Sequence, residues 1–114
     1  MPYVRIQTNT EIDESKRENL LREVSSEVAN ELGKSENYVM VAMAPQIDMI
    51  FGGSNAGCAF VELKSISLPH NKTTLLAKLV CDLMQKHLGV PPDRTYIEFS
   101  DAERSLWGWN SGTF

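Results

Sequence analysis

The sequence is poor in the residues that build crosslinked or metal-bound folds, with two cysteines and two histidines among 114 residues. Cys58 and Cys81 are too few for a disulfide framework, and neither belongs to a CxxC motif of a redox or zinc site. We therefore expect reduced, buried thiols. His70 and His87 do not stand at a metal-ligand spacing from each other or from the cysteines, so no metal is expected.

Long apolar runs and an excess of basic residues are also absent. No stretch approaches the roughly 18 apolar residues of a membrane span, and the first residues lack the basic and apolar regions of a secretory signal. Fifteen acidic residues against eleven basic ones give a net charge of -4, whereas nucleic-acid binding requires a basic surface. Nucleic acid and membrane are therefore poor candidate partners. We expect a cytoplasmic protein, whose release would need a route independent of a signal peptide.

The common catalytic motifs of hydrolases, nucleotide-binding proteins and metalloproteases are missing as well. The segment Phe51-Gly52-Gly53-Ser54 resembles part of a phosphate-binding loop, but no helix start follows it, so we interpret it as a turn. The sequence does contain enough apolar residues for a hydrophobic core, since 42% of the residues are hydrophobic. This composition and length predict one globular domain spanning residues 1–114.

The two halves of the chain contain a weak internal repeat. Five residues recur at an offset of 56 positions, namely Leu20, Val24, Val28, Leu32 and Gly33, which match Leu76, Val80, Met84, Leu88 and Gly89. In each half the apolar residues fall every four positions, as on one face of a helix. The glycine directly after them is typical of a helix C-terminus. Each half is therefore predicted to contain one long helix.

Helix starts and flanking strands complete a repeated β-α-β unit. The first helix is predicted to start near Ser15, which forms a capping box with Glu18, and the second near Asn71. Strand-like segments precede and follow each helix, at Tyr3–Asn9, Tyr38–Ala44, Cys58–Ile66 and Thr95–Ser100. Two such units predict an α+β fold with a four-stranded sheet and both helices on one face.

The segment Tyr38–Ala44 is apolar without alternation, which is typical of a strand buried on both sides. Because only two helices are available to cover the sheet, we expect other subunits to cover its second face. The alternative is a strand with a few exposed apolar residues. The segment Trp107–Asn110 could form a short fifth strand at a subunit edge.

Pro2 is the most unusual candidate for chemistry. A small residue at position 2 normally allows Met1 to be removed, which would leave a secondary amine able to act as a base. Burial or a nearby cation would lower the pKa of such an amine and raise its neutral fraction. Most prolines at this position of a chain have no catalytic function. A retained Met1 would make the Pro2 nitrogen an amide and abolish this function.

A lysine and several aromatic residues are further candidates. Lys34 directly follows the predicted helix end, where a lysine usually only complements the helix dipole. The aromatic residues are Tyr38, Tyr96, Trp107, Trp109 and Phe114, and aromatic residues in strands usually belong to the core. From these residues alone we predict an oligomeric α+β domain with a potential N-terminal amine base.

Motifs along the whole chain resemble the macrophage migration inhibitory factor family. They are Pro2 behind Met1, Gly33-Lys34 followed by Tyr38-Val39-Met40-Val41, Phe51-Gly52-Gly53-Ser54, Pro92-Asp93-Arg94 before Tyr96-Ile97, and Gly108-Trp109-Asn110 with Thr113-Phe114. The match runs from Pro2 to Phe114 with nearly constant spacing. The resemblance implies the tautomerase fold, in which the repeated β-α-β unit assembles as a homotrimer.

The resemblance also implies an activity, that of a cofactor-free phenylpyruvate tautomerase acting on small aromatic 2-oxo acids. Pro2 would be the general base that moves a proton between the carbon next to the carbonyl and the enol oxygen. Lys34 matches the family's pocket lysine, which would hold the substrate's negative charge and help to keep Pro2 neutral.

Other site residues follow from the same resemblance. Ser65 and Ile66 match the strand end whose backbone contacts substrate. Residues that match the family's pocket lining, partly from a neighbouring subunit, are Tyr38, Tyr96, Trp107 and Phe114. A pocket with aromatic walls suits an aryl pyruvate.

Three features depart from the family pattern. Glu98 stands where the vertebrate members have asparagine, and a carboxylate there would stabilise a protonated Pro2 and repel an anionic substrate. We therefore expect weak activity toward arylpyruvates. Trp107 replaces a small aliphatic residue and is expected to narrow the pocket. Cys58 lacks the second cysteine of the family's thiol pair, so no thiol oxidoreductase activity is expected.

Two other functions stay open at this point. One is a cytokine-like signalling protein that binds a receptor, with the pocket as a relic or a docking site. The other is a structural trimer without chemistry. The sequence separates these from the enzyme poorly, because the signalling members of the family also lack a signal peptide.

Overall fold

Two β-α-β units follow one another in the computed structural model, which describes all residues 1–114. The long strands and helices are β1 Tyr3–Thr8, α1 Glu14–Leu32, β2 Met40–Ala44, β3 Ala59–Ile66, α2 Thr73–Leu88 and β4 Thr95–Ala102. A short hairpin of β5 Gly108–Trp109 and β6 Gly112–Thr113 ends the chain. Single 3-10 turns form at Glu36–Tyr38, His70–Lys72, Pro92–Arg94 and Arg104–Leu106.

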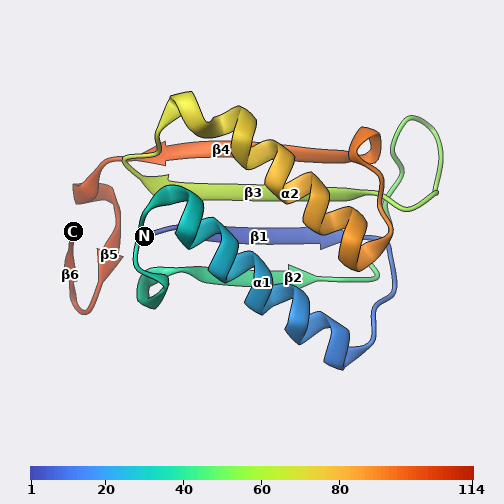
Figure 1. The fold of residues 1–114 in the computed structure, drawn as a ribbon, viewed down its shortest axis with the longest axis horizontal. Helices are drawn as coiled ribbons and strands as arrows, with labels where there is room; N and C mark the ends of the chain where they lie inside the picture. The colour runs from blue at the N-terminus through green and yellow to red at the C-terminus, as the bar shows by residue number, and fades with distance from the viewer.

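The four long strands form one mixed sheet in the order β2-β1-β3-β4, and both helices lie on the same face of it (Figure 1). β1 is parallel to β2, and β3 is parallel to β4, as a helical crossover within each unit requires. The two units meet where β1 and β3 pair antiparallel. The predicted α+β class, the repeated unit and the position of the helices are therefore confirmed.

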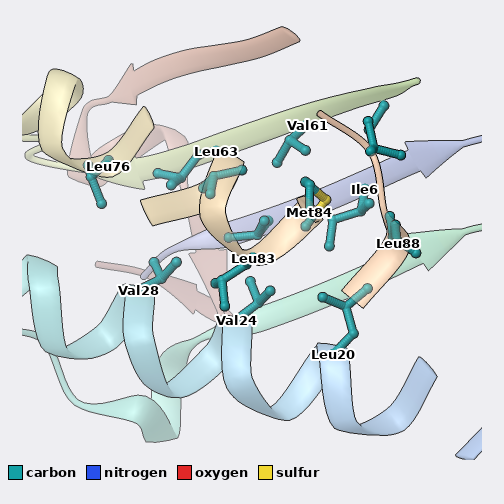
Figure 2. Close-up of a cluster of buried hydrophobic side chains, with 14 of the residues drawn as sticks. Ile6, Leu20, Val24, Val28, Val61, Leu63, Leu76, Leu83, Met84 and Leu88 are labelled. Atoms are coloured by element: carbon teal, nitrogen blue, oxygen red, sulfur yellow. The ribbon is translucent and has the colours of Figure 1, made fainter. Parts of the chain in front are cut away.

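The core lies between the sheet and the two helices. The repeated helix positions are the ones that fill it, since Leu20, Val24, Leu76 and Val80 are each at most 1% exposed. Figure 2 shows the stripes of α1 and α2 facing side chains of the central strands, such as Ile6. Full burial of one such aliphatic side chain stabilises the fold by about 1.5–3 kcal/mol.

Both helices end at the predicted glycines. Gly33 and Gly89 have φ angles of 63° and 68°, in the left-handed region that glycine adopts without strain. The amide of Lys34 donates to the carbonyl of Ala29 at 2.9 Å, which closes the C-terminus of α1. The backbone at Gly33 therefore determines where Lys34 leaves the helix.

Both helix starts were predicted imperfectly. The capping box is wrong, because Ser15 lies inside the first turn of α1 and Asp13 is the N-cap. Asp13 has extended backbone, and its carbonyl accepts the first helical hydrogen bond from the amide of Arg17 at 2.8 Å. The second helix begins at Thr73 rather than near Asn71, because the 3-10 turn His70–Lys72 precedes it.

Two predicted strand segments also differ from the structure. Tyr38 lies in the 3-10 turn Glu36–Tyr38, so β2 begins only at Met40. The predicted fifth strand at Trp107–Asn110 is reduced to Gly108–Trp109, which pairs with Gly112–Thr113 instead of a sheet edge. Positive φ angles at Asn110 and Ser111 form the tight turn of this hairpin.

The segment Phe51-Gly52-Gly53-Ser54 is the turn that the sequence predicts. Phe51 and Ser54 exchange two backbone hydrogen bonds, and both glycines have positive φ. The guanidinium of Arg94 donates to the carbonyls of Phe51 and Ser54 and also stands over the Phe51 ring, 5.2 Å from its centre. This arginine therefore ties the turn to the start of β4.

No element of the chain covers the second face of the sheet (Figure 1). On β2, Val41 and Met43 pack against the core, while Met40 is 65% exposed. The side chains that alternate away from the core on the other strands include Arg5, Glu62 and Glu98. Cover by other subunits remains a prediction.

Neither helix is both long and apolar enough to cross a bilayer.

Candidate functional site

A cavity of about 490 Å³ opens at the end of the sheet where β1 begins. We call it the N-terminal pocket. Its lining residues come from the chain start, the turn before β2, β3 and the C-terminal hairpin, and are Met1, Pro2, Tyr3, Asn37, Tyr38, Val39, Met40, Lys64, Trp107, Gly108, Trp109 and Phe114. The pocket therefore gathers segments from both ends of the sequence around Pro2.

Pro2 is buried and belongs to the lining of this pocket. Its carbonyl accepts a hydrogen bond from the amide of Met40 at 3.0 Å, which extends the pairing of β1 with β2 by one residue. Pairing with β2 fixes the backbone of Pro2, so its nitrogen has a defined position.

Lys34 reaches the same end of the sheet from the end of α1. Its Nζ donates to the Ser65 hydroxyl at 2.8 Å and to the carbonyl of Ile66. Burial lowers the pKa of Lys34, and the carboxylate of Asp101 acts in the opposite direction. Ser65 is completely buried. The three residues predicted to act together at this strand end are therefore in direct contact.

The chain terminus lies within the electrostatic reach of Lys34. The pKa of the Met1 amine is lowered, first by partial burial and second by the Lys34 ammonium. A positive charge nearby disfavours protonation of an amine for simple Coulombic reasons. An amine at this end of β1 is therefore held more neutral than a free chain terminus.

Asp101 stands behind Lys34 at the end of β4. It pairs with Ser65 in the register of β3 and β4. Its carboxylate accepts from the amide of Leu68 at 3.0 Å and contacts Nε2 of His70 at 3.0 Å. These two contacts, together with the charge of Lys34, lower the pKa of Asp101. The carboxylate anchors the segment between β3 and α2 beside the lysine.

Aromatic side chains form one wall of the N-terminal pocket. The rings of Tyr38 and Trp109 meet edge to face with centres 5.4 Å apart, and Trp109 stacks on Phe114 at 5.4 Å. The amide of Phe114 donates to the carbonyl of Trp107 at 3.2 Å, which closes the hairpin over the pocket. Tyr38, Trp107 and Phe114 therefore line one pocket together with Pro2; their contact with substrate stays a prediction.

Tyr96 and Glu98 do not reach this pocket within one chain. Tyr96 lies near the start of β4, 61% exposed, with its ring centre 4.7 Å from that of Phe51. Glu98 lies on the uncovered face opposite Glu62 of β3. Their predicted contact with substrate would require a neighbouring subunit and stays a prediction.

Sequence reasoning missed Lys64 as a pocket residue. The sequence signal that could have found it is the alternation of side chains along β3. A strand that points Ser65 toward Lys34 points Lys64 to the other face of the sheet. The pairing of Lys64 with Tyr3 places it one residue from Pro2, but only the register of β1 and β3 reveals this.

Comparisons with known proteins agree with the fold. A family model described as macrophage migration inhibitory factor matches residues 1–114. The chain is 36% identical to the macrophage migration inhibitory factor of Xenopus laevis and 38% identical to a homologue from Brugia malayi, covering 100% of this chain and 99% of each relative. A crystal structure of a homologue from Prochlorococcus marinus is similar at a TM-score of 0.93, with 39% identity over 98% of both chains.

Proposed function

Because the chain belongs to the macrophage migration inhibitory factor family, we propose that it is a cofactor-free tautomerase of phenylpyruvate-like 2-oxo acids, with Pro2 as the general base. The observation that carries the proposal is the contact of Lys34 with the end of β3, together with its electrostatic effect on the chain terminus that precedes the buried Pro2. This arrangement places an amine and an aromatic wall in one pocket and a fixed cation at the adjoining strand end. These are the groups that proton transfer next to a carbonyl requires.

The proposed reaction moves one proton and changes no oxidation state. After removal of Met1, the neutral Pro2 nitrogen takes a proton from the carbon next to the keto group. The electrons of the broken C–H bond form the C=C bond, and the carbonyl electrons move to the oxygen. Transfer of that proton from Pro2 to the enolate oxygen gives the enol, and the reverse sequence restores the ketone. Pro2 is protonated in the intermediate and neutral again at the end.

Lys34 has two roles in this proposal. Its ammonium attracts the carboxylate and the developing enolate of the substrate, in a pocket where burial strengthens electrostatic interactions. The same charge disfavours protonation of the amine at the chain start, as it does for the Met1 amine. A 2-oxo acid is therefore bound beside a base in its reactive form.

We place the complete site at a subunit interface of a homotrimer. The sheet face that carries Tyr96 and Glu98 is uncovered in one chain, and both side chains are exposed. Packing of a second chain against the pocket would add them to its wall. The carboxylate of Glu98 would then face the substrate and the base, and we expect weak turnover of arylpyruvates for this reason.

The proposal is tested by the rate of phenylpyruvate keto-enol conversion in protein whose intact mass confirms loss of Met1. The matched variant Pro2→Gly keeps a free N-terminal amine, primary instead of secondary, but removes the ring. We expect the variant to lose about 100-fold or more in kcat/KM, because its amine is no longer held in place by the ring and a positioned general base contributes about this much.

A second control is the same protein with Met1 retained, in which the Pro2 nitrogen is an amide. It should be as inactive as buffer. Equal rates in the processed protein and Pro2→Gly, or no activity in the processed protein, would overturn the proposal and favour a receptor-binding protein.

A further inference from the structure

Lys64 is a cation that lines the N-terminal pocket, whereas Lys34 lies outside its lining, at the neighbouring end of β3. Lys64 lines the same cavity as Pro2 and is paired with Tyr3 in the register of β1 and β3. Lys34 contacts the neighbouring residues Ser65 and Ile66. Because successive strand residues point to opposite faces, Lys64 and the Ser65 side chain that binds Lys34 lie on opposite faces of the sheet.

The two lysines differ in how strongly the protein already holds them. The ammonium of Lys34 is fixed by a hydroxyl and a carbonyl of β3. Lys64 has only one charged contact, to Glu62 at 3.9 Å, and its side chain is 42% exposed. An exposed ion pair of this kind stabilises by about 0–1 kcal/mol. Lys64 is therefore available to an incoming anion.

Glu62 does not depend on Lys64 for its counterion. Its other carboxylate oxygen lies 3.9 Å from the guanidinium of Arg5 on β1. When Lys64 turns toward a ligand, Glu62 keeps a cation on its other side. The two cations beside Glu62 thus allow Lys64 to change partner without leaving an unpaired carboxylate.

We propose that Lys64 is a second anion-binding group of the site, which selects 2-oxo acids that carry a further carboxylate over monoanionic ones. This inference rests on the proposed function, because it assigns a substrate class to the same pocket. Lys34 binds the 2-oxo acid end beside Pro2, and Lys64 binds the second carboxylate. The cavity of about 490 Å³ is lined by Tyr38, Trp107 and Trp109, which would contact the ring of such a substrate.

The experiment compares 4-carboxyphenylpyruvate with its ring methyl ester, which has a similar shape but one charge fewer. The kcat/KM ratio of the two is measured for the wild type, Lys64→Gln and Lys64→Arg. Lys16→Gln serves as the control, because Lys16 is exposed on α1, outside the pocket. We expect Lys64→Gln to lower the ratio of acid to ester at least tenfold, while Lys64→Arg and Lys16→Gln keep it.

Binding gives a readout that does not depend on turnover. Trp107 and Trp109 line the pocket, so their fluorescence reports the Kd of each probe. Lys64→Gln should weaken binding of the acid at least tenfold more than that of the ester, and high salt should reduce the difference. Equal losses for both probes, or no loss for either, would overturn the inference. Absence of turnover with the charge-dependent binding intact would count against the proposed function alone.

Discussion

At the scale of single residues, the chemistry depends on one amine and the charges around it. Lys34 is held by the end of β3, and the pKa of the neighbouring chain terminus is lowered by burial and by this lysine. Any carboxylate added to the pocket acts in the opposite direction, because it favours the protonated amine. The identity of the residue at position 98 should therefore determine how active the site is.

We predict that Glu98→Asn raises kcat/KM for phenylpyruvate by roughly twofold to fivefold, the gain in neutral amine at pH 7 when a base pKa just below 8 falls by half to one unit. The substitution removes the charge and shortens the side chain by one methylene group. The initial rate of keto-enol conversion, followed by the absorbance of the enol at neutral pH, measures this effect. Glu18→Gln is the control, since Glu18 pairs only with Arg22 on the outer side of α1. A rate in Glu98→Asn that is unchanged or lower would contradict this explanation.

Asp101 provides a second residue-scale prediction, through stability. Its pKa is lowered in the folded protein by the Leu68 amide, by His70 and by Lys34. Folding therefore gains from the charged carboxylate above the unfolded-state pKa of about 3.9, and this gain is lost as the pH falls through the lower folded-state value.

Urea unfolding from pH 6 to pH 3 measures this effect. Asp101→Asn should be less stable than the wild type at pH 6, and the difference should shrink toward pH 3. Asp48→Asn, at an exposed loop carboxylate, should show no such trend. A difference between Asp101→Asn and the wild type that is constant with pH would mean that the charge of Asp101 contributes nothing to folding.

At the scale of elements, two glycines perform the same structural task at equivalent places. Gly33 and Gly89 both end helices in the left-handed region, and a Cβ at either position would meet nothing within 4 Å. The cost of a side chain there is thus the backbone strain alone, about 1–2 kcal/mol. Only Gly33 precedes a residue of the site.

We predict that Gly33→Ala and Gly89→Ala lower the free energy of unfolding by a similar amount, while only Gly33→Ala also lowers kcat/KM, because it shifts Lys34. Chemical unfolding and phenylpyruvate kinetics on the two variants test this. Equal activity in the two variants would show that the position of Lys34 does not depend on the helix end.

The elements also show which parts of the fold the sequence predicts. Apolar residues every four positions and a following glycine predict both helices, because core burial and backbone geometry are local properties of the chain. The start of α1 was predicted within one residue, but its capping residue was predicted wrongly, since any of several polar residues before Glu14 could cap the helix, and Asp13 does so without a side-chain hydrogen bond. Lys64 was missed because its place beside Pro2 depends on strand register, which joins residues far apart in the sequence.

At the scale of the whole molecule, the single chain leaves its sheet half covered. Both helices lie on one face of the sheet. On the two edge strands, Met40 of β2 and Tyr96 of β4 are more than half exposed. The predicted aromatic and acidic residues of β4 lie away from the N-terminal pocket. Assembly of several chains would cover the exposed sheet face and would also bring the β4 residues of one chain to the N-terminal pocket of another.

We predict a homotrimer, detected by native mass spectrometry at micromolar concentration as a species of three times the 12.8 kDa of the chain. Specific activity should fall on dilution in step with the trimer fraction, because the site needs two chains. A dominant monomer that retains full specific activity would contradict a shared site.

The central claim is that Pro2 is a base kept neutral by Lys34, and the most direct measurement is the pKa of the Pro2 nitrogen. Nitrogen-15 NMR titration of proline-labelled protein without Met1 provides it, in the wild type, Lys34→Gln and the charge-preserving Lys34→Arg. The account predicts a pKa below the 7.7–8.0 of an ordinary chain terminus, raised by about one unit in Lys34→Gln and not in Lys34→Arg. A pKa at or above the ordinary value that Lys34→Gln leaves unchanged would contradict it.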